Sequence, residues 1–206
     1  ASWHCRVSSL SELLTPAAEE FGALRRECEA YDEMQMADPE RAGGSEYAEI
    51  CALSFRQSIA AHKLVADIDG TPLFFSKENF SNGCIATVDV TYPSAPLYLL
   101  TAPALLKGML IPILDYAETG RWKFPFAPHD LGTYPLANGQ VYGGGERTDD
   151  NQMPVEECGN MLLLAGALVE FGGDLDFARR YRETLKLWAD YLLDKGYDPE
   201  NQLCTD

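Results

Sequence analysis

The sequence predicts a mainly α-helical protein, built from helical hairpins with short β elements in its loops. Apolar residues recur at helical spacing through several long segments, and loops containing glycine or proline separate these segments. The 206 residues are 46% hydrophobic and 11% aromatic, which is typical of a globular chain with a substantial core. The segments group as three hairpins, over residues 10–66, 86–118 and 154–195. We therefore expect residues 1–206 to form a single domain.

The first predicted hairpin joins a helix over residues 10–36 to a helix over residues 46–66. Both segments carry an apolar stripe at roughly helical spacing, and a proline and two glycines interrupt the pattern between them. Two antiparallel helices joined by a short glycine-containing loop make a helical hairpin. His62 lies on the second apolar stripe, where a core histidine is more common than a ligand.

A turn signal and a short β-prone run follow this hairpin. Residues 69–72 are Asp-Gly-Thr-Pro, and the apolar run at 73–75 could pair locally as a strand. Residues 84–90 could be either a strand or a first helical turn. Asp89 lies in that apolar stretch, a setting that raises the pKa of a carboxylate or requires a partner for it.

The second half of the chain predicts three further helices. The first covers residues 103–118, and Pro112 should kink or interrupt it. The segment 154–171 is apolar on nearly all sides, which indicates a helix buried on several faces. The last predicted helix, 175–195, has one apolar face and one charged face.

Composition excludes several classes of function. A net charge of −16 argues against a nucleic-acid partner, because phosphate binding requires clustered lysine and arginine. The longest apolar run, 161–169, is about half the ~20 residues that cross a membrane. The N-terminus shows no signal-peptide pattern. None of the six cysteines forms a Cys-x-x-Cys pair, so a zinc motif is not indicated, and free thiols are favoured over disulfides.

Residues 127–161 concentrate titratable side chains in an irregular stretch that leads into the apolar helix. Loops of this kind are where functional sites tend to lie, and the three glycines at 143–145 permit unusual backbone geometry or close approach by a ligand. The alternative is a surface loop whose acids are merely hydrated. Glu156 and Glu157 also have a structural interpretation, since acids at a helix start complement the helix dipole.

Several segments resemble the glutaminase A family, and together they cover essentially the whole chain. They are Phe-Ser-Lys-Glu-Asn-Phe-Ser-Asn-Gly-Cys at 75–84, Thr-Val-Asp-Val-Thr-Tyr-Pro at 87–93, Phe-Pro-Phe-Ala-Pro-His-Asp-Leu-Gly at 124–132, Val-Tyr-Gly-Gly-Gly-Glu at 141–146 and Met-Pro-Val-Glu-Glu-Cys-Gly-Asn-Met at 153–161. The resemblance implies a six-hairpin, glycosidase-like (α/α) toroid and hydrolysis of L-glutamine to L-glutamate and ammonia. It also implies that the protein is secreted or periplasmic. It further implies that this chain is the N-terminal portion of the toroid.

The catalytic residues must be argued from chemistry. Amide hydrolysis requires a base for water, a proton donor for ammonia and stabilisation of an oxyanion, and carboxylates in an acidic loop suit the first two roles. A serine triad is not indicated, and Cys84 is more readily a buried thiol than a nucleophile. We expect no cofactor and no metal, since adjacent acids in a loop are more often simply hydrated, although His129-Asp130 and Asp149-Asp150 could hold a hard cation. The candidate catalytic residues are Asp89, Asp130, Glu146 and Glu157, and the candidate substrate-binding residues are His129, Arg121, Trp122, Tyr142 and Asn160.

Two alternative functions remain open from the sequence. A glycoside hydrolase would use paired carboxylates with aromatic platforms, for which Trp122, Tyr134 and Tyr142 are candidates. Glutamine would instead require an acid and an arginine for its α-amino and α-carboxylate groups, and Arg121 or Arg147 could supply the arginine. A non-catalytic module is the third possibility, with self-association through exposed hairpin faces.

Overall fold

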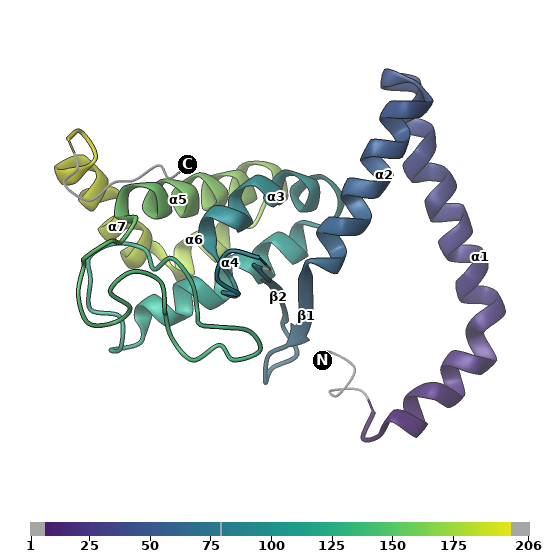
Figure 1. Ribbon diagram of the computed structural model, residues 1–206, viewed down its shortest axis with the longest axis horizontal. Coiled ribbons are helices and arrows are strands. Elements are labelled where there is room, and N and C mark those ends of the chain that lie inside the picture. The colour runs from purple at the N-terminus through teal and green to yellow at the C-terminus, as the bar shows by residue number, and fades with distance from the viewer. Residues whose placement is uncertain (1–6, 79, 199–206) are drawn as a thin grey trace.

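The computed structural model describes residues 7–78 and 80–198 and confirms the mainly α-helical fold class. This part of the chain contains seven helices and one two-stranded sheet (Figure 1). The elements are α1 (Leu10–Gly43), α2 (Ser45–Ala60), β1 (His62–Ala66), β2 (Pro72–Ser76), α3 (Val88–Thr101), α4 (Pro103–Glu118), α5 (Pro154–Gly172), α6 (Leu175–Arg180) and α7 (Arg182–Lys195). Helical hairpins are therefore present as predicted, while closure into a toroid remains a prediction.

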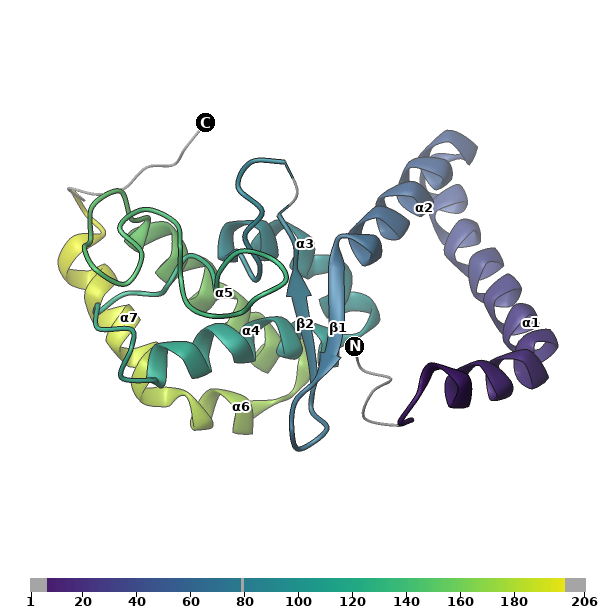
Figure 2. The same ribbon diagram turned by 60° about the horizontal axis from the view of Figure 1, so that its bottom comes forward.

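Helices α1 and α2 form an arm that projects from the rest of the molecule. The C-terminal part of helix α1 packs beside α2, and α1 lies well away from α3–α7 in both views (Figures 1 and 2). It has no buried residue, and its apolar side chains Leu14 and Phe21 are 58% and 63% exposed. The helix also continues through Asp38 and Pro39 to Gly43, where a break was predicted. Proline costs a helix one backbone hydrogen bond, and here that cost does not end the helix.

The second predicted helix is too long, because its last part is a strand. Helix α2 ends at Ala60, and β1 pairs with β2 in antiparallel register, with His62 opposite Ser76. The predicted local pairing of residues 73–75 is confirmed. Strand β2 also lies directly against α4, where the backbone carbonyl of Pro72 would be only 2.5 Å from a Cβ placed on Gly108. Glycine at 108 therefore permits this close approach.

Helices α3, α4 and α5 pack together and supply much of the core (Figure 2). Helix α4 matches its predicted bounds and continues through Pro112. Helix α5 buries residues on several sides, as its apolar pattern predicted. The final predicted helix is divided at Tyr181 into α6 and α7, and the Tyr181 hydroxyl donates to Asp115 of α4 at 2.8 Å. The buried side chain of Tyr181 thus anchors the junction of α6 and α7 against α4.

The long loop between α4 and α5 is irregular but not superficial. Its first part, residues 126–132, is almost entirely buried against the core. Backbone hydrogen bonds join Ile85 to Gly132 and Leu131 to Ile85, at 2.9 and 3.0 Å, so this part of the loop runs beside the segment that precedes α3. The loop thereby carries polar residues into the interior, next to the first turn of α3.

Two sequence predictions concern the state of the cysteines and the lack of a membrane-spanning segment. Cys28, Cys51, Cys84 and Cys158 are free thiols, whereas Cys5 and Cys204 lie outside the described residues. Within residues 7–78 and 80–198, every helix is too short or too polar to cross a membrane.

Candidate active site

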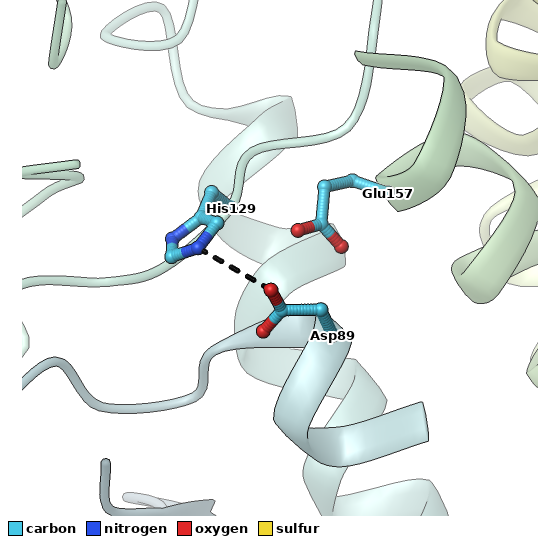
Figure 3. Close-up of side chains that lie close together, drawn as sticks. All are labelled: Asp89, His129 and Glu157. Atoms are coloured by element: carbon cyan, nitrogen blue, oxygen red, sulfur yellow. Dashed lines mark ion pairs between the residues drawn. The ribbon is translucent and has the colours of Figure 1, made fainter. Parts of the chain in front are cut away.

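Three titratable side chains from separate parts of the chain converge at one place. Asp89 comes from the first turn of α3, His129 from the buried loop and Glu157 from the first turn of α5 (Figure 3). One ligand atom from each lies within 4.8 Å of the others, and His129 Nε2 is 3.8 Å from Asp89 Oδ2. We refer to these three residues as the acidic cluster.

The backbone fixes the relative positions of the first two members. The amide of Val88, next to Asp89, donates to the carbonyl of His129 at 2.9 Å. Asp89 therefore faces the loop across the start of α3. The side chain of Asp89 is 27% exposed and that of His129 only 3% exposed, so Asp89 is the member that solvent or a substrate can reach.

Asp130 lies behind His129 and holds its ring. It is fully buried, and its carboxylate accepts hydrogen bonds from the backbone amides of Gly132, Val141 and Tyr142 at 2.8–3.1 Å. His129 Nδ1 is 2.9 Å from Asp130 Oδ2, and the ring of Tyr142 stacks on the imidazole at 4.0 Å between centroids. Because the Asp130 oxygens act as acceptors, Nδ1 carries a hydrogen and Nε2 points toward the acidic cluster.

Glu157 is fully buried, with only weak compensation from its surroundings. It is 0% exposed, and neither side-chain oxygen has a hydrogen-bond partner among the described residues. Burial, followed by the negative charges of Asp89 and Glu156, raises the pKa of Glu157 well above its ordinary value, and the nearby Asn160 amide opposes this only in part. Burial also raises the pKa of Asp89, although the positive charge that His129 can carry lowers it. Two carboxyl groups with raised pKa values in one cluster are typical of a functional site.

Two buried glutamines position the loop, and sequence reasoning did not identify them. The side chain of Gln140 accepts from the backbone amide of His129 at 2.7 Å and donates to Gln152 at 2.5 Å. Gln152 in turn donates to the carbonyl of Gly145 at 3.1 Å. Uncharged amides give no titration signal in a sequence, and only their place between glycine-rich segments could have pointed to them.

Cys84 does not act as a nucleophile in this arrangement. Burial, assisted by the negative charges of Asp130 and Glu78, raises the pKa of the Cys84 thiol to about 12. A thiol with this pKa is protonated at neutral pH and is a poor nucleophile. The prediction of a buried thiol agrees with this environment.

The sequence of the chain matches the family model of the glutaminase A six helical-hairpin domain over residues 44–206. The chain belongs to the glutaminase A family. It is 36% identical to glutaminase A of Aspergillus oryzae over 205 residues, which cover 99% of this chain and 29% of that protein. It is also 32% identical to a probable glutaminase of Arthroderma benhamiae over 168 residues, 81% of this chain and 19% of the relative. The chain thus spans less than a third of these relatives.

Within this glutaminase A domain, the other predicted site residues have different surroundings. Glu146 forms an ion pair with Arg121 at 2.8 Å and accepts from the Tyr116 hydroxyl at 2.7 Å. Arg121 also donates to the carbonyl of Asn138 at 2.6 Å, so both charged candidates are engaged in a local network. Trp122 is only 6% exposed, and its indole N–H donates to the Phe126 carbonyl at 2.7 Å.

The structure therefore brings together some of the predicted residues and separates others. Asp89, Glu157 and His129 form the acidic cluster, while Asp130 and Tyr142 support its imidazole. The remaining candidates fall into two groups. Asn160 adjoins the cluster on α5, whereas Arg121, Glu146 and Trp122 belong to the packed loop beside α4.

Proposed function

We propose that this chain contributes the catalytic site for hydrolysis of L-glutamine to L-glutamate and ammonia. The relatives it matches are named glutaminase A and probable glutaminase. The observation that carries the proposal is the convergence of Asp89 and Glu157 on one histidine, with both carboxyl pKa values raised. Raising the pKa of a carboxyl group makes it a better proton acceptor and lets it return the proton later in the reaction.

Asp89 is the member of the acidic cluster suited to contact the substrate, because it is the exposed one. In the proposed reaction, Asp89 takes a proton from water while the water oxygen attacks the side-chain carbonyl carbon of glutamine. The tetrahedral intermediate collapses, the C–N bond breaks, and Asp89 returns the proton to the leaving ammonia. Glu157 adjoins Asp89, and the negative charge of Asp89 favours the protonated form of Glu157.

A glycoside hydrolase is less well supported by the aromatic residues of this site. Trp122, one of the three candidates for a sugar platform, packs against Phe124 and Phe126. Tyr142 stacks on His129 itself, with the two ring planes 16° apart. Tyr134 is 47% exposed but packs near Lys77 at the sheet. A stacked sugar would need aromatic faces open to a cleft.

The test is product analysis with two substrate classes. Ammonia release from L-glutamine and reducing-end release from oligosaccharides are measured for the 206-residue chain and for a chain extended to the length of its relatives. We expect ammonia from L-glutamine. Activity of both chains would locate the machinery within these residues, whereas activity of the longer chain alone would mean that further residues complete the site. Sugar release without ammonia would contradict the proposal.

A further inference from the structure

The acidic cluster brings acceptor atoms together without a donor between them. Because Asp130 fixes the hydrogen of the neutral imidazole on Nδ1, His129 presents a lone pair at Nε2. This atom faces Asp89 Oδ2 at 3.8 Å, beyond hydrogen-bond distance. Glu157 adds a carboxyl group within 4.8 Å of both. In a buried setting, a proton or a cation among such acceptor atoms relieves their repulsion.

Among these acceptors, the Glu157 carboxyl group has the greatest need of such a partner. Its carboxyl group is fully buried and both oxygens are without a hydrogen-bond partner among the described residues. Native proteins seldom leave a buried carboxyl group in this state, because its desolvation is uncompensated. Figure 3 shows the Glu157 carboxyl group beside Asp89 and His129. The unsatisfied group therefore adjoins the two other acceptors and completes a set of three.

We propose that Asp89, His129 and Glu157 bind a divalent first-row transition metal such as Zn²⁺ or Mn²⁺. One imidazole nitrogen and two carboxylate oxygens suit such ions better than Mg²⁺ or Ca²⁺, which prefer oxygen alone. Ligand atoms around a tetrahedral Zn²⁺ lie about 3.4 Å apart, given metal–ligand distances of about 2.1 Å. The present separations, up to 4.8 Å, require only small side-chain rotations to reach this geometry.

Two features beyond the ligand set fit a metal centre. Asp130 accepts from the far nitrogen of His129, which is the carboxylate–histidine arrangement that orients a metal-binding imidazole. The 27% exposure of the Asp89 side chain leaves one side of the cluster accessible, so a water or substrate oxygen could take a further coordination position. Three protein ligands with an open position are characteristic of catalytic metal sites.

The role of the cation rests on the proposed function, but its binding does not. A bound cation would stabilise the oxyanion formed from the glutamine carbonyl. Asp89, His129 and Glu157 would then hold the cation, which would lower the pKa of a bound water so that this water could lose its proton to solvent. Substitution of Asp89 or Glu157 would still abolish hydrolysis.

The test is calorimetric titration of the chelator-treated 206-residue chain with ZnCl₂, MnCl₂ and MgCl₂. We expect one Zn²⁺ or Mn²⁺ per chain with a Kd on the order of micromolar or tighter, and weaker Mg²⁺ binding. Glu157→Gln should weaken binding by about 100-fold or more, and Asp130→Asn by about 10–100-fold. Glu170→Gln, on the exposed face of the same helix, should bind like wild type.

Circular dichroism checks that each variant is folded. If Glu157→Gln does not fold, Asp89→Asn at the exposed side of the cluster provides the same comparison. Absence of stoichiometric binding, or equal binding by wild type and the cluster variants, would overturn the metal site. Ammonia release that survives chelation, with no metal bound, would overturn the metal site and leave the proposed function intact. Metal binding, together with no ammonia release from a chain extended to the length of its relatives, would support the site and contradict glutamine hydrolysis.

Discussion

Replacing Glu157 with methionine should stabilise the metal-free protein while destroying the site. Methionine has a similar length and removes a buried carboxyl group that has no hydrogen-bond partner among the described residues. An unsatisfied buried polar group costs about 1–3 kcal/mol. For a chain of this size, 1 kcal/mol corresponds to about 2–4 °C in Tm. The expected increase in Tm is therefore about 2–12 °C at pH 7.

Thermal unfolding of chelator-treated protein, followed by circular dichroism, measures this increase. The matched control is Glu170→Met, because Glu170 lies on the exposed side of α5 and its replacement should change stability by less than about 0.5 kcal/mol. A gain in stability together with a loss of function would identify Glu157 as a residue retained for its chemistry. A Tm of Glu157→Met below that of wild type would refute the reasoning, since it would show that the carboxyl group makes stabilising contacts.

Two further predictions concern the framework. Gly108→Ala should destabilise the protein by about 1–3 kcal/mol, because the new Cβ would lie 2.5 Å from the Pro72 carbonyl oxygen. Gly166 has open space around it, so Gly166→Ala should stabilise α5 by up to about 1 kcal/mol. Equal denaturation midpoints for the two variants would contradict this contrast. Burial lowers the pKa of His62, and the hydrogen bond to the Ser58 carbonyl opposes this with a smaller effect. The contribution of His62 to stability is therefore fully present above about pH 6.5 and is lost as the pH falls below that value. Urea unfolding at pH 7.5 and 5.5 should show a smaller pH dependence in His62→Gln, and an unchanged dependence would be inconsistent with a buried neutral imidazole.

Helix positions were predictable where apolar periodicity coincided with packing. Helices α4 and α5 match their predicted ranges closely, because both lie in the core and their apolar residues are buried. The strand β1 was missed because Val65 continues the apolar spacing of the preceding helix, while the partner strand that overrides this pattern lies at residues 72–76. Pairing with a separate segment is a tertiary effect, which local spacing does not contain.

Within the site, two sequence signals were informative to different degrees. Asp89 was identified because a carboxylate among apolar residues requires a partner or a function, and the structure places it beside Glu157. Glu157 and Glu146 were both identified as acids of the titratable stretch 127–161, but Glu146 pairs with Arg121, because an acid in a loop can equally satisfy a local cation. The supporting role of Gln140 depends on a contact with His129, eleven residues away, that no local pattern encodes.

The exposed arm bears on the alternative of an interaction module. Apolar side chains of α1 and α2, including Phe21 and Ile50 at 63% and 62% exposure, lie on helices with little contact to the rest of the molecule. The chain spans less than a third of its relatives, and α1 lies outside the matched domain, which begins at residue 44. Self-association through this arm remains a prediction, and it is compatible with a catalytic role for the acidic cluster.

The most direct test of the account compares ammonia release from L-glutamine by wild type, Asp89→Asn and Asp150→Asn. Asp150 lies exposed in the loop between α4 and α5, outside the acidic cluster. All three proteins are assayed in whichever chain length is active, and their Tm values establish that they are equally folded. The account predicts that Asp89→Asn loses about 10²–10⁴-fold in rate and that Asp150→Asn retains the wild-type rate. A wild-type rate in folded Asp89→Asn would contradict the central claim that the acidic cluster is the hydrolytic site.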